Sequence, residues 1–119
     1  MANDGLVPNE AQAANYGLVA DMRAEVEVPR GGILSRTVFE NETLGLTLFA
    51  FDVGQELTEH TSTRAAIIEV VEGEAEIRLD GDVHLLAAGA WIAMPPGMRH
   101  AIRATKPLVM ALTLLRFPT

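Results

Sequence analysis

Short apolar runs separated by glycine- and proline-containing turns make up most of the chain from about residue 20 onward. No segment after residue 20 shows the roughly 3.6-residue apolar period of an amphipathic helix. Asp80–Gly81 favours a tight hairpin, and Pro95–Pro96–Gly97 marks a break between strands. We predict strands over residues 24–28, 33–39, 44–53, 65–71, 74–79, 83–86, 91–94, 101–103 and 108–117. Many short strands of this kind predict an all-β domain, either a sandwich or a barrel.

Both faces of the predicted strand at residues 44–53 carry apolar side chains. Residues 44, 46, 48 and 50 are leucine or alanine on one face, and Phe49 and Phe51 lie on the other. A strand of this composition is normally covered on both sides. We therefore expect the outer face of the barrel to be covered as well, and we predict a homodimer. Either the even or the odd residues of the last strand, 108–117, would supply the buried surface.

Length and composition limit the classes of protein to which the chain can belong. The 119 residues suffice for one domain, and we assign residues 1–20 to an N-terminal arm and residues 21–119 to the barrel. The absence of cysteine excludes disulfides and thiolate metal sites, and a net charge of −7 disfavours nucleic acid as a partner. We see no signal peptide and no apolar run near the ~18 residues of a membrane span, so we expect a cytoplasmic protein.

Two histidines stand in comparable glycine-framed segments. His60 lies within Gly54–Gly73, and His100 lies within Gly89–Ala104. Distant segments that each end a strand in a tight turn can meet inside a small barrel. Two imidazoles in one hollow could hold a metal ion or polarise a ligand. We therefore predict that His60 and His100 face the same cavity.

These two segments resemble the paired motifs of the cupin superfamily, and the resemblance covers about residues 33–115. The first family motif is Gly, five residues, His-x-His, a short gap, Glu, six residues and Gly. The second is Gly, five residues, Pro-x-Gly, two residues, His, three residues and Asn. The matching residues are Gly54, His60 and Gly73 in the first motif and Gly89, Pro95, Gly97 and His100 in the second. The resemblance implies a small jelly-roll barrel, or double-stranded β-helix.

Three positions depart from the family pattern. Ser62 stands in place of the second His, Ala66 in place of Glu, and Ala104 in place of Asn. Because family members typically bind a divalent metal through three His and one Glu, the resemblance implies that only His60 and His100 remain as metal ligands. The chain looks like a subgroup of small, mostly uncharacterised RmlC-like cupins that share this reduced set. Zn, Ni, Fe and Mn are the possible cofactors that the resemblance implies.

Strand parity does not supply a third metal ligand. Glu59 and Glu69 have the wrong parity, and His84 should face solvent on a hairpin. Glu56 and Thr58 share the parity of His60, but Glu56 should lie nearer the mouth of the barrel.

The residues that we expect around the ligand have cavity-facing parity or lie beside the two histidines. Arg64 could hold a substrate carboxylate, although a solvated turn arginine is the other interpretation. Arg99 should point away from the cavity, and Trp91 should serve packing. The predicted ligand-binding residues are Phe49, Phe51, His60, Ser62, Arg64, Ile68, Met94 and His100.

Two functions are compatible with these residues. The first is a barrel that binds a small molecule without catalysis, with His60 and His100 facing the cavity. The alternative is a metal-dependent enzyme of the dioxygenase or isomerase type, in which both histidines bind the metal. The reduced ligand set favours the first function. A metal-free isomerase with a histidine base would also need a neighbouring carboxylate to orient the imidazole, and the sequence identifies none.

Overall fold

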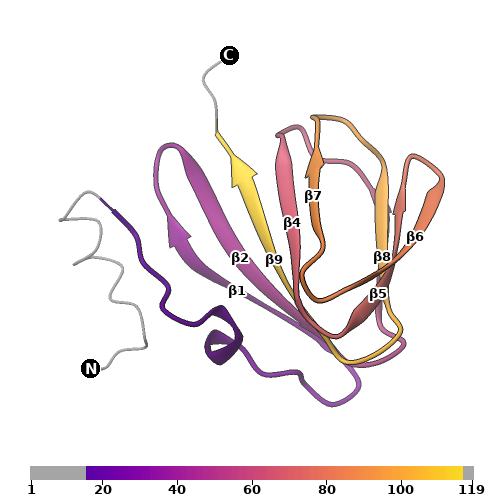
Figure 1. The fold of residues 1–119 in the computed structure, drawn as a ribbon. Coiled ribbons are helices and arrows are strands. Elements are labelled where there is room, and N and C mark those ends of the chain that lie inside the picture. Colours follow the sequence, from indigo (N-terminus) through magenta and orange to yellow (C-terminus); the bar gives the residue numbers. More distant parts are fainter. Residues whose placement is uncertain (1–15, 117–119) are drawn as a thin grey trace.

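The computed structural model describes residues 16–116, which form two antiparallel sheets (Figure 1). The first sheet has the strand order β1-β2-β9-β4-β7, and the second has the order β3-β8-β5-β6. A 3₁₀ turn, η1 (Met22–Glu25), precedes the strands. The strands are β1 (Ile33–Glu40), β2 (Leu44–Phe51), β3 (Glu56–His60), β4 (Ala66–Glu72), β5 (Glu74–Leu79), β6 (Asp82–Ala87), β7 (Trp91–Met94), β8 (His100–Ala104) and β9 (Leu108–Leu115).

The connections between strands place the second sheet over the first. β2 leads into β3, β4 into β5, β6 into β7, and β8 into β9. Each connection joins strands at corresponding positions, because the order β2-β9-β4-β7 in one sheet matches β3-β8-β5-β6 in the other. The two sheets therefore face each other across a common interior (Figure 1). This arrangement confirms the predicted jelly-roll barrel.

The predicted strands from residue 33 onward are all present, with bounds that differ by one or two residues at most. The predicted strand at 24–28 is wrong, because η1 occupies its first residues and the rest is not strand. Burial does not follow the alternating pattern either, since Ala24 is exposed and Glu25 is buried. β3 was not among the predicted ranges.

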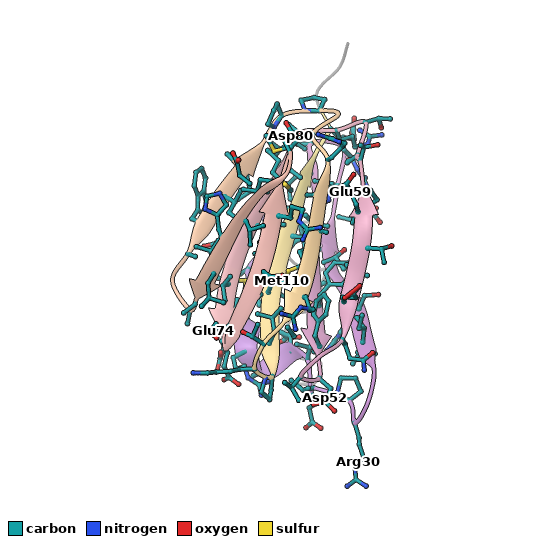
Figure 2. The ribbon with its side chains drawn as sticks, turned by 90° about the vertical axis from the view of Figure 1, so that its right-hand side faces the viewer. Arg30, Asp52, Glu59, Glu74, Asp80 and Met110 are labelled. Carbon is teal, nitrogen blue, oxygen red and sulfur yellow. The ribbon has the colours of Figure 1, made fainter. Side chains whose placement is uncertain are left out.

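Mostly aliphatic side chains from both sheets fill the interior of the barrel. Phe51, Ile68 and Met110 come from the first sheet, and Ile77 and Ile102 come from the second. Each of these side chains is at most 2% exposed, so each contributes the full transfer free energy of about 1.5–3 kcal/mol per large side chain. Met110 lies about midway between the two ends of the barrel in Figure 2.

A second apolar cluster lies on the outer face of the first sheet. Residues 19–28, which we call the N-terminal strap, pack valine and methionine side chains against this face. The sheet contributes Leu48 and Ala50 from β2 and Val109 and Ala111 from β9. The expectation of a covered outer face is therefore met here by the chain's own N-terminal strap. Val109 and Ala111 belong to the odd-numbered face of β9, one of the two candidate dimer surfaces, and the strap packs against it.

Polar contacts hold the N-terminal strap in place. Asp21 caps η1 by accepting a hydrogen bond from the Arg23 backbone nitrogen. The guanidinium of Arg36, from β1, donates to the backbone carbonyl of Glu25 at 2.7 Å and lies 3.4 Å from its buried carboxylate. Arg23 also pairs with Glu72 of β4 at 2.8 Å, although that exposed pair contributes little to stability.

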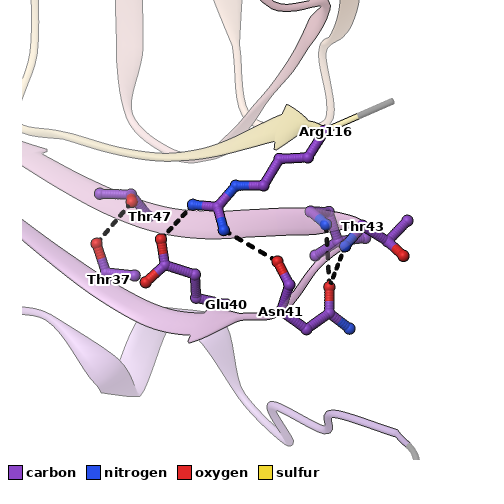
Figure 3. Close-up of polar contacts among 7 residues, drawn as sticks. Thr37, Glu40, Asn41, Thr43, Thr47 and Arg116 are labelled. Carbon is purple, nitrogen blue, oxygen red and sulfur yellow. Dashed lines mark hydrogen bonds and ion pairs between the residues drawn. The ribbon is translucent and has the colours of Figure 1, made fainter. Parts of the chain in front are cut away.

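The β1–β2 hairpin is closed by polar contacts that extend to the end of β9 (Figure 3). The Asn41 side chain accepts hydrogen bonds from the backbone nitrogens of Thr43 and Leu44, which fixes the turn. Arg116 donates to the Asn41 carbonyl at 2.9 Å and forms an ion pair with Glu40. Among residues 16–116 no helix is long and apolar enough to cross a membrane.

The turn between β2 and β3 is organised by a carboxylate. Asp52 accepts hydrogen bonds from the backbone nitrogen of Gly31 at 2.6 Å and from that of Val53 at 2.8 Å. These two bonds stabilise the charged carboxylate and hold the pKa of Asp52 below its usual value. The turn therefore sets where β3 begins, and β3 carries His60.

Gly73 joins β4 to β5 in a conformation and a space that only glycine tolerates. Its φ is +88°, in the left-handed region that residues with a Cβ avoid. A Cβ at this position would lie 1.9 Å from the carbonyl oxygen of Pro107. Gly81, in the hairpin predicted at Asp80–Gly81, also has a positive φ, of +90°.

We expect Gly73→Ala to lose about 4 kcal/mol or more of unfolding free energy, because backbone atoms must move to relieve the overlap. Gly81→Ala is the matched control, since its φ is +90° but nothing lies within 4 Å of the added Cβ. That control should cost only about 1–2 kcal/mol of backbone strain. Urea denaturation of both variants measures the difference. Equal losses would show that the contact with Pro107 is unimportant.

Candidate functional site

The pairing of β3 with β8 brings His60 and His100 directly opposite each other. Their ring centroids are 4.1 Å apart, and the ring planes are inclined by 59°. His100 is 6% exposed, and it shares its strand face with the buried Ile102 and Ala104, so it points into the barrel. His60 is exposed and lies at the rim. The prediction that the two imidazoles come together is confirmed, with His100 buried in the barrel and His60 exposed.

A β-bulge in β3 makes this pairing possible. Leu57 pairs with the inward-facing Ile102, and the register then shifts before His60 pairs with His100. Because of the extra residue, Leu57 and His60 face the same side although they are three positions apart. The prediction that Glu56 shares the face of His60 is therefore wrong. Glu56 pairs with Arg103 and lines a groove of about 360 Å³ on the outer face.

A backbone carbonyl orients each imidazole ring. The Nδ1 atom of His60 lies 2.7 Å from the Thr58 carbonyl oxygen, and that of His100 lies 3.1 Å from the Met98 carbonyl oxygen. A carbonyl oxygen can only accept a hydrogen bond, so each Nδ1 must carry the proton. In the neutral rings, both Nε2 atoms therefore keep a free lone pair. Neither Nε2 has a hydrogen-bond partner among residues 16–116.

The loops that carry the two histidines are hydrogen-bonded to each other. The Gly97 backbone nitrogen, in the loop before His100, donates to the Ser62 carbonyl at 2.8 Å in the loop after His60. The Ser62 hydroxyl accepts from the Arg64 backbone nitrogen at 3.1 Å. Gly97 has a φ of +83°, so glycine is needed to present its nitrogen in this direction. This hydrogen bond joins the loop before His100 to the loop after His60.

The acidic residues at this end of the barrel point away from the histidines. The Arg99 guanidinium lies 3.7 Å from the Asp80 carboxylate and 3.9 Å from the Glu59 carboxylate, and all three side chains are exposed. Asp80 and Glu59 lie at the same end of the barrel in Figure 2. The expectation that Arg99 faces outward agrees with these contacts.

The other predicted ligand-binding residues differ in their surroundings. Phe51, Ile68 and Met94 are buried in the interior cluster, whereas Phe49 is half-buried at its edge. Ser62 is half-buried beside the histidines, and Arg64 is exposed. Their role in ligand binding stays a prediction. Two determinants of the site had no sequence signal, namely the bulge in β3 and the two carbonyl partners of the imidazoles.

The described residues do not provide the donor set of a typical catalytic metal centre. Two imidazole rings lie close together, but no group of three His, Cys, Asp or Glu side chains that could hold an ion exists within residues 16–116. Catalytic zinc sites use three protein ligands, and the facial iron site needs a carboxylate. Ala66 is buried opposite Met94 and offers no donor. His84 is exposed on β6, where it pairs with Ile77 rather than with either histidine.

We expect Gly97→Ala to disturb both imidazoles from a distance, because the strained backbone would weaken the Gly97–Ser62 hydrogen bond. The ring ¹⁵N signals of His60 and His100 should shift, while those of His84 should not. Gly81→Ala again serves as the control, since it carries the same kind of backbone strain outside these loops. Unchanged signals of His60 and His100 in Gly97→Ala would contradict the coupling of the two loops.

The carbonyl partners also predict the tautomer of each histidine. Long-range ¹H–¹⁵N spectra of the neutral rings, recorded at alkaline pH, should show Nδ1 protonated and Nε2 unprotonated in His60 and His100. A neutral Nε2–H tautomer in either ring would contradict the assigned hydrogen bonds.

Comparison with known proteins places this geometry in a wider context. Residues 47–115 match the profile of the cupin domain. A conserved protein of unknown function from Streptococcus pyogenes, SPY1581, is 34% identical over 86% of this chain and 90% of its own, with a TM-score of 0.77. An RmlC-like cupin from Shewanella frigidimarina is 27% identical over 78% and 84% of the two chains, with a TM-score of 0.70. KdgF from Halomonas sp. is 27% identical over 82% and 93%, with a TM-score of 0.67. None of the curated proteins matches the chain.

Proposed function

Because the chain belongs to the cupin family, we propose that its barrel binds a small molecule through the Nε2 atoms of His60 and His100. The observation that carries this proposal is the pair of Nε2 atoms that remain free to accept hydrogen bonds. The Thr58 and Met98 carbonyls orient the two rings through their Nδ1 atoms. Since both rings are already oriented, a ligand does not have to meet the full entropic cost of ordering them.

The surroundings of the histidine pair favour a ligand that is polar at one end. Two neutral Nε2 atoms accept hydrogen bonds, so the ligand must offer O–H or N–H groups to them. Met98 and Leu79 are half-buried and pack against the interior cluster on the His100 side, and they give the site an apolar wall. A few converging polar groups on an apolar wall are typical of small-molecule sites.

A second candidate function is the metal-dependent enzyme, because the same two lone pairs could bind Zn, Ni, Fe or Mn. The ion would need a third ligand from the bound molecule or from water. The residues present fit such a centre only incompletely, and we therefore rank it second. A metal-free histidine base is less favoured, because the orienting partners are carbonyls rather than carboxylates.

We expect tag-free protein to contain less than one equivalent of transition metal and to bind hydrogen-bond-donating fragments whose contacts include both imidazoles. His60→Ala and His100→Ala should each weaken the binding of such a fragment by about tenfold. His84→Ala, the matched control, should leave the binding unchanged. Elemental analysis and NMR fragment titration measure the two quantities. Stoichiometric metal that both His60→Ala and His100→Ala abolish would favour the enzyme instead.

Homodimer formation and a cytoplasmic location stay predictions. Support for a subunit interface comes from large apolar side chains on the two edge strands that follow each other in sequence. Val83 and Leu85 of β6 and Trp91 of β7 are each more than half exposed. A second copy of the chain would remove this apolar surface from water.

A further inference from the structure

A pair of hydroxyl groups lies on the inner face of β1 and β2. Thr37 and Thr47 are direct cross-strand partners, and their Oγ1 atoms are 2.9 Å apart (Figure 3). Thr47 alternates with Phe49 and Phe51, which pack toward the interior cluster, so Thr47 faces the interior as well. Thr37 is exposed and Thr47 is half-buried, so water reaches this pair.

The topology places the hydroxyl pair across the barrel from the histidines. β2 faces β3, since the turn at Asp52 joins them and they occupy corresponding positions in the two sheets. Thr47 precedes the end of β2 by four residues, and His60 follows the start of β3 by four residues. At about 3.3 Å per residue, both lie at a similar height above the turn. Figure 1 shows the two sheets meeting near this turn and diverging toward the opposite end of the barrel.

The two walls have complementary hydrogen-bonding capacity. On the β3–β8 wall the neutral imidazoles offer two acceptors. On the β1–β2 wall one threonine hydroxyl donates to the other, which leaves one O–H free to donate and several lone pairs free to accept.

We propose that Thr37 and Thr47 form a second anchor for the molecule that binds His60 and His100, and that this molecule is a compact polyol with hydroxyl groups at both ends. This inference rests on the proposed function. Its hydroxyls donate to the imidazoles on one wall and exchange hydrogen bonds with the threonine pair on the other. A ligand held at both ends fits the barrel in one orientation.

Xylitol is the probe for this proposal, and 1,5-pentanediol, which has the same carbon chain without the inner hydroxyls, is the comparison ligand. Titration of ¹⁵N-labelled protein with xylitol should shift the amides of Thr37 and Thr47 and the ring nitrogens of His60 and His100. The double variant Thr37→Val/Thr47→Val should bind xylitol about tenfold more weakly, because it loses two hydrogen bonds while keeping the side-chain shape. The diol should bind more weakly than xylitol to the native protein and lose less in the variant.

Thr43→Val, in the turn of the same hairpin, is the matched control and should bind xylitol as the native protein does. Circular dichroism and urea denaturation of each variant test whether it is folded. If xylitol shifts the histidines but binds equally well to the double variant, the threonine anchor is wrong and the proposed function stands. If xylitol shifts the threonines and leaves both histidines unchanged, the inference that one polyol contacts both walls is wrong. No shift at any of the four residues in the native protein overturns the inference of a polyol ligand, and the fragment titration with His84→Ala still decides the proposed function.

Discussion

The hydrogen-bonded pairing of β3 with β8 is the interaction on which the functional part of the structure depends. β8 lies between β3 and β5, so its register is set from both sides and its inward face is buried. The bulge in β3 then decides which of its residues share that inward face. Because a shift of one residue exchanges the two faces of a strand, the same sequence without the bulge would turn His60 outward. Cooperation between the two imidazoles therefore depends on one extra residue in an edge strand.

Apolar side chains on both faces of the first sheet are covered, and this coverage explains how so small a barrel remains folded. The interior cluster joins the two sheets, and the outer cluster joins the N-terminal strap to β2 and β9. A carboxylate within the outer cluster, that of Glu25, is acceptable because Arg36 approaches both its side chain and its backbone. The strap shows why apolar residues on both faces of a strand do not by themselves require a second subunit. Part of the cover can come from a segment that is not a strand, here a 3₁₀ turn and the residues that flank it.

The histidine pair differs from the metal centre that the cupin motifs imply in the number and charge of its donor groups. Two of the four metal ligands that the cupin motifs imply are replaced by side chains with no charge, Ser62 and Ala66. The loss removes charge compensation for a cation but leaves two oriented acceptors, each fixed by a backbone carbonyl. Carbonyl partners orient a ring as a carboxylate would, yet they add no negative charge to stabilise an imidazolium. Recognition through hydrogen bonds suits this arrangement better than proton transfer.

The amino-acid sequence alone determined the fold class, most strand positions and the meeting of His60 with His100, because alternation, turn glycines and the two motifs are local signals. It did not reveal β3, the bulge or the face of Glu56, since a bulge arises from how one strand is matched to its neighbour. The interpretation of residues 24–28 as a strand failed because a short alternating run fixes neither the hydrogen-bond pairing nor the burial of its residues, and Glu25 is buried beside Arg36. Only the tertiary structure decided which groups from distant strands share the interior, including the carbonyl partners of the imidazoles and the facing pair of Thr37 and Thr47. Those relations depend on how the two sheets pack, and no local pattern in the chain carries that information.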